Sequence, residues 1–472
     1  MRILFAASEA HPYASTGGLA GVAGSLPGAL AENGHSVSLV MPFYGSVRKP
    51  EDLVWVDHGL VTSAGENFGL ARTVHPELGF TVYLVSRDEY FAREGVYGPG
   101  PGSSYPDNSA RFSFFCRAVA ALSQGLPESP DVVHCHDWQT GLVPVYLRNA
   151  IRPATVFTIH NLHFQGNFPP EEYGCTRLPW ALFNMEGLEF YGSFSCLKAG
   201  MVFADRITTV SETYAREIQT PVYGEGLEGV LSRRSDRLSG ILNGIDYSVW
   251  NPLSDPALAR GYSADSISPR RKCREELLDI AGITGAGPVA GMVSRLTGQK
   301  GLDLLFPLMG TLSGEGMNFV ILGTGEESCQ DTLAGLQDEY PGSISAIFAY
   351  DDSMARKIFA GSDLLLMPSR FEPCGLAQMM GMRYGAVPLV RWTGGLRDTV
   401  TDVSRGGCGF VFHRTDPEEL LKTLRRAADL YNRRNRWSWL IKKCMRQDNS
   451  WRSRIGPYQE VYRKAIDDRN RR

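Results

Sequence analysis

The sequence lacks the marks of several large classes of protein. Its apolar runs all fall short of the ~18 residues that a membrane-spanning helix needs. A signal peptide needs a longer apolar stretch than residues 3–7, which Glu9 soon interrupts. A strong charge imbalance is also missing, since 48 Lys and Arg stand against 51 Asp and Glu, a net charge of −3. Nucleic-acid-binding proteins usually carry a basic excess. We therefore expect neither a membrane nor a nucleic acid as a partner.

The cysteines also lack a recognisable pattern. There are nine of them, scattered along the chain, with no Cys-x-x-Cys pair. This distribution argues against a zinc ribbon or a disulfide framework and is typical of reduced thiols in a cytoplasmic protein. What the sequence does have is length: 472 residues, 43% of them hydrophobic, are enough for two or three domains with sizeable cores.

Short apolar runs recur along the chain, each followed by a polar or glycine-rich turn and then a helical pattern. Buried parallel strands are typically continuous apolar runs, and strands that alternate with helices indicate βαβ units. The sequence therefore predicts an α/β fold with parallel sheets. The predicted strands are residues 3–7, 37–41, 82–85, 131–134, 155–159, 206–210, 289–293, 319–322 and 364–367.

A polar stretch rich in Pro and Ser, between residues 240 and 270, indicates a domain boundary. The alternation of strands and helices restarts only after it. We predict two Rossmann-like domains of similar size, residues 1–245 and 246–450. The basic tail, residues 451–472, has a helical pattern.

Two basic residues follow the predicted strand 289–293. Arg295 and Lys300 lie five residues apart on a polar loop that leads into a predicted helix. Cations in this position can converge on one anion, and the start of a helix adds N–H donors and positive potential. A diphosphate would fit such a site. The alternative is that both are solvated surface residues, which is usual for Lys and Arg.

A carboxylate, Glu372, follows the predicted strand 364–367. Open α/β sheets bind ligands at the carboxyl ends of their strands, so Glu372 is a candidate for contact with a sugar or with developing positive charge. The alternative is a loop carboxylate paired with Arg370.

Glycine-rich turns are a further set of candidate ligand contacts. The tetrapeptide Thr-Gly-Gly-Leu occurs at 16–19 and again at 393–396, and Gly323-Thr324-Gly325 follows the predicted strand 319–322. Such turns let a backbone approach a ligand closely and present N–H donors to an anion. Neither this turn nor the first strand carries the full Gly-x-Gly-x-x-Gly fingerprint, which argues against an NAD enzyme.

Four of the nine histidines fall in two segments, residues 131–138 and 159–163, which each end a predicted strand. Histidine and aspartate are good metal ligands. However, no third ligand accompanies His134 and His136 at a recognisable spacing. We therefore predict that these polar groups face the same interdomain cleft as the other loops and hold no metal.

These motifs and others, taken in order, resemble those of bacterial glycogen synthases and plant starch synthases over nearly the whole chain. The matching motifs are Ser8-Glu9, Thr16-Gly17-Gly18-Leu19, Asp107-Asn108 with Arg111-Phe112, His136-Asp137-Trp138, Thr158 through Leu162, Thr209-Val210-Ser211, Asn243 through Asp246, Ser294-Arg295-Leu296 through Asp303, Pro368 through Leu376, Arg391 through Leu396, and Ser450-Trp451 with Tyr458.

The resemblance implies a GT-B glycosyltransferase, with two Rossmann-like domains facing a deep cleft and a C-terminal helix that crosses back to the first domain. It implies transfer of glucose, with retained anomeric configuration, from ADP-glucose or less often UDP-glucose to the non-reducing end of an α-1,4-glucan. No metal and no other cofactor is expected. The choice of nucleotide and the oligomeric state stay open.

The resemblance also implies roles for individual residues. Arg295 and Lys300 would hold the diphosphate and stabilise the departing nucleotide. Glu372 would support the oxocarbenium-like transition state, and Asp137 would lie on the acceptor side. His160 would bind the donor sugar and place its carbonyl group by the anomeric carbon.

Further donor-binding positions are implied by the same match. Tyr350 would stack on the base, and Gly394 with Gly395 would donate N–H groups around the donor. The other implied positions are Ser15, Gly17, Gly18, Gly323, Cys374, Gly375 and Thr393.

Two positions depart from the family pattern Lys-x-Gly-Gly-Leu-x-Asp. Ser15 replaces the Lys and Gly21 replaces the Asp. The donor phosphates would then have one cation fewer. A charge-assisted contact contributes about 1.5–3 kcal/mol, or roughly ten- to hundred-fold in rate or affinity. We expect a slower or differently tuned synthase; the alternative is a glucan-binding or regulatory protein with weakened catalysis.

Overall fold

The computed structural model describes residues 1–56, 59–100 and 102–471. The described residues fall into two compact units. Unit 1 comprises Met1–Gly244 and Trp451–Arg472, and unit 2 comprises Ile245–Ser450. The two chain segments that lead into and out of unit 2 are paired, since the N–H of Ile245 donates to the carbonyl oxygen of Asn449 at 2.9 Å.

The described strands of unit 2 form a six-stranded parallel sheet in the order β15-β14-β13-β16-β17-β18. Each strand is an apolar run that is buried along most of its length, as expected for a parallel sheet covered on both faces. Along the chain, β13, β14 and β15 are added toward one edge of the sheet, and β16, β17 and β18 toward the other edge. The strand order therefore reverses between β13 and β16. The strands are β13 (Val289–Val293), β14 (Asn318–Leu322), β15 (Ile344–Ile347), β16 (Leu364–Met367), β17 (Val387–Arg391) and β18 (Phe410–Phe412).

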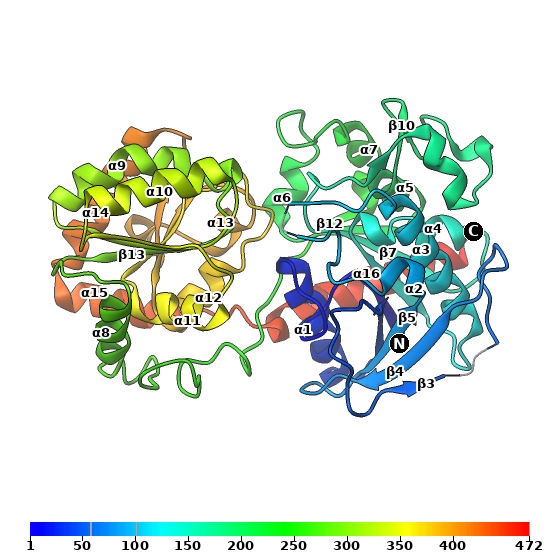
Figure 1. Cartoon of the computed structure of the whole chain (residues 1–472), viewed down its shortest axis with the longest axis horizontal. Helices are drawn as coiled ribbons and strands as arrows, with labels where there is room; N and C mark the ends of the chain where they lie inside the picture. Colours follow the sequence, from blue (N-terminus) through cyan, green and yellow to red (C-terminus); the bar gives the residue numbers. More distant parts are fainter. Residues whose placement is uncertain (57–58, 101, 472) are drawn as a thin grey trace. The chain divides into compact units, whose positions relative to one another are not determined.

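Helices cover both faces of this sheet. Figure 1 shows α9 and α10 on one face and α8, α11 and α12 on the other. Of the helices described in unit 2, the bounds are α8 (Arg270–Ile280), α9 (Leu302–Gly314), α10 (Glu327–Glu339), α11 (Asp352–Gly361), α12 (Ala377–Tyr384), α13 (Gly394–Thr399), α14 (Pro417–Tyr431) and α15 (Arg434–Met445).

The main sheet of unit 1 is mixed. Its described strands follow the order β12-β11-β7-β6-β1-β2-β5-β4-β3, which reverses between β1 and β6. The strands are β1 (Arg2–Ala6), β2 (Ser36–Pro42), β3 (Val54–Trp55), β4 (Gly69–Val74), β5 (Thr81–Ser86), β6 (Val132–His136), β7 (Ala154–Ile159), β11 (Arg206–Thr209) and β12 (Leu238–Gly240). A small antiparallel sheet joins β8 (Asn167–Phe168), β10 (Ser193–Ser195) and β9 (Glu189–Phe190).

Two further strands add an antiparallel edge to the main sheet, beside the parallel strands that the sequence predicts. β4 runs antiparallel to β5, and β3 runs antiparallel to β4. The side chains of β4 alternate between buried and exposed toward its end, which is typical of an antiparallel strand with one face in solvent. The nine predicted strands, which are all apolar runs, are confirmed to within two residues at each end.

The last helix of the chain, α16 (Ile455–Asn470), belongs to unit 1. It packs against β6, β7 and β11, and the hydroxyl group of Tyr462 lies 2.9 Å from Nδ1 of His134. The other helices described in unit 1 are α1 (Gly18–Glu32), α2 (Asp88–Phe91), α3 (Asn108–Gly125), α4 (Val143–Tyr146), α5 (Cys196–Phe203), α6 (Glu212–Glu217) and α7 (Glu228–Arg233). None of the described helices is both long enough and apolar enough to cross a membrane.

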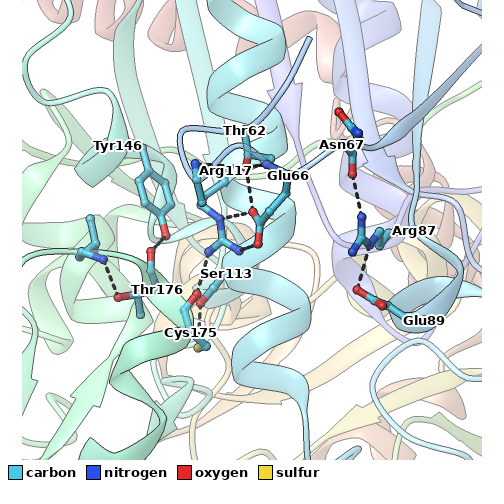
Figure 2. A network of polar contacts seen from close by, with 12 residues as sticks. Thr62, Glu66, Asn67, Arg87, Glu89, Ser113, Arg117, Tyr146, Cys175 and Thr176 are labelled. Atoms are coloured by element: carbon cyan, nitrogen blue, oxygen red, sulfur yellow. Dashed lines mark hydrogen bonds and ion pairs between the residues drawn. The ribbon is translucent and has the colours of Figure 1, made fainter. Parts of the chain in front are cut away.

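A polar network on α3 ties separate segments of unit 1 together (Figure 2). The guanidinium group of Arg117 binds both carboxylate oxygens of Glu66, each at 2.8 Å, and donates to the carbonyl oxygen of Cys175 at 2.7 Å. The hydroxyl group of Thr62 donates to the same carboxylate at 2.8 Å. Because the Arg117 side chain is buried, these partners replace its hydration and fix two loops on one helix.

The attachment of α16 can be tested at Arg469. Its guanidinium group donates to the carbonyl oxygens of Leu147, Arg148 and Pro153, each at 3.2 Å, and lies 3.3 Å from the buried carboxylate of Asp205. We expect Arg469→Met to lower the free energy of unfolding by about 3 kcal/mol, because it leaves a buried charge uncompensated. Urea unfolding followed by circular dichroism measures the change.

The matched control is Arg463→Met, on the exposed face of the same helix. It should leave the urea midpoint unchanged. Equal midpoints for the two variants would contradict the role assigned to Arg469.

Candidate functional site

The residues predicted for the donor side of unit 2 all follow strands of one sheet, at the carboxyl ends. Arg295 and Lys300 come after β13, Glu372 comes after β16, and Tyr350 comes after β15. Gly323 follows β14, and the turn 393–395 follows β17. Since these strands are parallel, their carboxyl ends share one edge of the sheet. The order reverses between β13 and β16, which is where open α/β sheets bind their ligands.

Lys300 and Glu372 face each other across this reversal. Nζ of Lys300 lies 2.6 Å from Oε2 of Glu372, and the hydroxyl group of Ser369 donates to the same oxygen at 3.0 Å. Glu372 is only 7% exposed. The alternative prediction that Glu372 pairs with Arg370 is wrong, because Arg370 forms its ion pair with Asp303.

Three glycines allow the loops around this ion pair to touch. A Cβ atom on Gly301 would lie 2.1 Å from the carbonyl oxygen of Pro368, and one on Gly394 would lie 1.9 Å from that of Glu372. A Cβ atom on Gly395 would lie 2.1 Å from the carbonyl oxygen of Cys374. Gly301 and Gly394 also have positive φ, at 70° and 43°. Any side chain would therefore push these loops apart.

The N–H of Gly395 has a partner within the protein. It donates to the carbonyl oxygen of Glu372 at 3.0 Å and approaches that of Pro373 at 3.2 Å. The expected role of Gly395 as a donor to the ligand stays a prediction. The turn fixes the backbone of the loop that carries Glu372.

Gly323 likewise serves the packing of two loops. A Cβ atom on Gly323 would lie 1.8 Å from the carbonyl oxygen of Ser294, and one on Gly325 would lie 2.2 Å from the carbonyl oxygen of Leu296. The N–H of Leu296 donates a hydrogen bond to the carbonyl oxygen of Thr324 at 2.9 Å. The turn after β14 thus supports the loop that carries Arg295, which gives a structural reason for both glycines.

The other predicted positions of unit 2 differ in exposure. Tyr350 is 74% exposed and presents its ring to solvent. Cys374 and Thr393 are buried, and Gly375 occupies a left-handed conformation with φ of 71°. The side chain of Gln378 donates to the carbonyl oxygen of Gly375 at 2.9 Å. These residues hold the turn before α12 in shape.

In unit 1, Asp137 and His160 follow the adjacent strands β6 and β7. The carboxylate of Asp137 accepts a hydrogen bond from the N–H of His160 at 2.7 Å, and Nε2 of His160 lies 2.9 Å from Nδ1 of His136. Desolvation, and after it the negative charge of Glu9, raises the pKa of Asp137 to about 7. Burial lowers the pKa of His160 to about 3, so its ring is neutral. Asp137 has φ of 57°, a left-handed conformation that is rare for a residue with a side chain.

Glu9 joins this group, although no role of its own was predicted for it. It follows β1, next to β6 at the reversal of the strand order, and its carboxylate accepts a hydrogen bond from the N–H of Thr16 at 2.5 Å. Glu9 is 3% exposed, and burial raises the pKa of its carboxyl group to about 7. The signal for a role was the Ser8-Glu9 motif directly after the first predicted strand.

The first Thr-Gly-Gly-Leu turn leads into α1. Ser15, Gly17 and Gly18 are exposed, and no side chain caps the helix at Gly17. A Cβ atom on Gly17 or Gly21 would meet nothing within 4 Å, so neither glycine is required by packing. The residue types of the family motif would therefore fit at positions 15 and 21.

His134 and His136 lie in β6 among protein partners. His134 contacts the hydroxyl groups of Tyr462 at 2.9 Å and Thr158 at 2.6 Å. Across residues 1–56, 59–100 and 102–471, no group of three or more His, Cys, Asp or Glu side chains is arranged to hold a metal ion.

Comparisons with known proteins find matches along most of the chain. A family model described as starch synthase catalytic domain matches residues 2–233, and one described as glycosyl transferases group 1 matches residues 274–443. Glycogen synthase 2 of Geobacter sulfurreducens is 45% identical over 99% of this chain and 100% of its own length. Glycogen synthase of Syntrophotalea carbinolica is 44% identical over 99% of both chains.

Solved structures show the same similarity. The catalytic domain of starch synthase IV from Arabidopsis thaliana, bound to ADP and acarbose, has a TM-score of 0.90 and 31% identity, with 99% of both chains covered. Sucrose-phosphate synthase from Thermosynechococcus elongatus shares the fold, with a TM-score of 0.63 at 17% identity.

The raised pKa of Glu9 predicts how stability depends on pH. Between its usual 4.5 and about 7, the folded protein keeps a proton on Glu9 that the unfolded chain has released, so the free energy of unfolding falls as pH rises through this window. We expect Glu9→Gln to be more stable than wild type at pH 8 by roughly 1–3 kcal/mol, with the gain shrinking toward pH 4.5. Urea titrations across this range measure it.

Glu94→Gln, which replaces an exposed carboxylate, is the matched control. It should leave the free energy of unfolding unchanged at both pH 4.5 and pH 8. A gain from Glu9→Gln that did not depend on pH would contradict the titration of a buried carboxyl group as its cause.

Proposed function

Because the chain belongs to the glycogen and starch synthase family of glycosyltransferases, we propose that it transfers glucose from ADP-glucose to the non-reducing end of an α-1,4-glucan, with retention of configuration. It has the GT-B fold, with two Rossmann-like domains. The observation that carries the residue assignment is the contact between Lys300 and Glu372 at the reversal of strand order in unit 2. The free thiols of the chain, most of them buried, suit a cytoplasmic location.

The chemistry follows from charge. A nucleoside diphosphate leaves with added negative charge, which Lys300 and Arg295 would stabilise at the end of β13 together with the N-terminus of α9. Glu372 would stabilise the positive charge that develops on the sugar ring. Two cations and helix N–H groups supply the stabilisation that a metal ion gives in other phosphate sites, so the proposal includes no metal and no other cofactor.

The acceptor is assigned to unit 1. Asp137, whose pKa lies near neutrality, can both donate to and accept from a sugar hydroxyl group. His160, which is neutral and donates its backbone N–H to Asp137, would bind the donor sugar. The choice of ADP-glucose is supported by the ADP in the starch synthase IV structure and by Tyr350, whose exposed ring can stack on a purine.

Single substitutions at Lys300 and Glu372 test the assignment. We expect Lys300→Met and Glu372→Gln each to lower kcat by about 10²–10³-fold, because each removes a charge that acts on the transition state. Transfer of labelled glucose from ADP-glucose and from UDP-glucose to glycogen and to maltooligosaccharides measures this. Arg425→Met, which breaks an exposed ion pair with Glu315, is the control and should keep full activity.

Activity within ten-fold of wild type in both variants would contradict the assignment. Failure of the wild type to transfer glucose from either nucleotide to any primer would contradict the proposed activity itself. Binding of glycogen without any turnover would identify the chain as a glucan-binding protein.

Ser15 offers a test of the missing cation. We expect Ser15→Lys to raise kcat/KM for the nucleotide sugar by roughly ten-fold or more, since it restores a charge-assisted phosphate contact. Position 15 is exposed, so the longer side chain needs no repacking. Ser15→Met, of similar length without charge, is the control. Equal kinetics for Ser15→Lys and Ser15→Met would show that charge at this position has no part in donor binding.

A further inference from the structure

The guanidinium group of Arg391 is buried beside the loop that carries Glu372. Arg391 ends β17 and is 6% exposed. Its Nε atom donates to the carbonyl oxygen of Ser369 at 2.7 Å, Nη2 donates to that of Arg370, and Nη1 approaches that of His413 at 3.4 Å. Within the described residues, Arg391 forms no ion pair with a carboxylate. Its donors serve backbone carbonyl groups instead.

Two of these carbonyl groups belong to residues just before Glu372. Ser369 also donates its hydroxyl group to Oε2 of Glu372 at 3.0 Å, the same oxygen that binds Nζ of Lys300 at 2.6 Å. The position of Ser369 therefore sets the direction of the Glu372 carboxylate. Through that carboxylate it also sets the position of Lys300.

The segment 391–395 holds both ends of the loop 369–372, which carries Glu372. The side chain of Arg391 binds the carbonyl groups of Ser369 and Arg370, and the N–H of Gly395 binds that of Glu372 at 3.0 Å. Arginine is suited to the first end because its planar fork reaches several acceptors at once, which a lysine ammonium group on a single stem cannot do.

We infer that Arg391 is a positioning residue for the reaction, which acts by holding the Ser369–Arg370 backbone so that Glu372 and Lys300 stay in contact. This inference rests on the glucosyltransferase activity proposed above. Because Arg391 acts through Glu372, its loss affects the chemical step more than the binding of the donor.

Unit 2 contains a matched control. Arg270 is also 6% exposed, and its guanidinium group donates to the carbonyl oxygens of Tyr384 at 3.1 Å and of Ser362. Tyr384 and Ser362 lie just before β17 and β16, so Arg270 binds at the amino ends of these two strands. Arg391 binds at the carboxyl ends of the same two strands. A purely structural role would make the two arginines equivalent.

The first test compares Arg391→Lys with Arg270→Lys in glucose transfer. We expect Arg391→Lys to lower kcat by roughly ten- to hundred-fold with KM for ADP-glucose within about three-fold, since small misplacements of a catalytic group have effects of this size. Arg270→Lys should keep kcat, even where it lowers the urea midpoint as much. An equal loss of kcat in both variants would overturn the inference.

The second test places Arg391→Lys in the Glu372→Gln background. If Arg391 acts through Glu372, the second substitution should cost less than about two-fold, because residues that work as a unit are not additive. The same ten- to hundred-fold loss in both backgrounds would overturn the inference.

A crystal structure of each lysine variant gives a readout that needs no turnover. We expect the contact between Lys300 and Glu372 to be broken in Arg391→Lys and kept in Arg270→Lys. Its survival in Arg391→Lys would overturn the positioning role, whereas an inactive wild type would overturn only the proposed activity.

Discussion

Close contact between loop backbones, with no room for side chains, is the constraint on which the candidate site depends. At the carboxyl edge of the unit 2 sheet, Gly301 approaches Pro368, Gly394 approaches Glu372, and each distance to a Cβ position is near 2 Å. Because glycine lacks that Cβ atom, the two backbones can pack against each other here, and any larger residue would push the loops apart. The glycines therefore place Lys300 and Glu372 at a fixed separation before any substrate arrives.

That fixed separation has an energetic consequence. In a largely buried ion pair such as this one, the desolvation of two charges costs more than their attraction gains, unless further hydrogen bonds complete the pair. Ser369 supplies one such hydrogen bond to Glu372, and the loop beneath it is fixed by Arg391. The pair is thus preorganised, so a diphosphate that binds Lys300 meets a cation already in position, with little reorganisation at the moment of reaction.

The sequence predicted the parts of this arrangement better than their contacts. Strands such as β13 and β16 were evident because both faces are buried and their sequences are apolar throughout. In contrast, β4 was missed because one of its faces is solvent-exposed and its sequence alternates. Lys300 and Glu372 were each identified from a loop after a strand.

Their pairing depends on β13 and β16 being neighbours, and strand order is a property of the whole chain. The same holds for Glu9, which lies near Asp137 only because β1 and β6 are adjacent. The packing role of Gly395 was also missed, because a Gly-Gly turn that touches a ligand and one that touches another loop look alike in sequence.

The two units differ in how they handle charge, and this difference fits two different substrates. In unit 2, Lys300 and Arg295 are cations that would suit the anionic diphosphate of the proposed donor. In unit 1, burial raises the pKa values of Glu9 and Asp137 toward 7 and lowers that of His160 to about 3. Near neutral pH these groups are largely or partly uncharged, yet all of them can form hydrogen bonds. Such a group of polar and nearly uncharged side chains would suit the neutral glucan that is proposed as the acceptor.

A lysine at position 15 would bring a cation to the same loop, because the N–H of Thr16 already binds the carboxyl group of Glu9. Positive charge there would favour the ionised form of Glu9 and lower its pKa. The serine in this chain removes that influence. The replacement therefore bears on the pKa of Glu9 as well as on the phosphate contacts that a lysine would add.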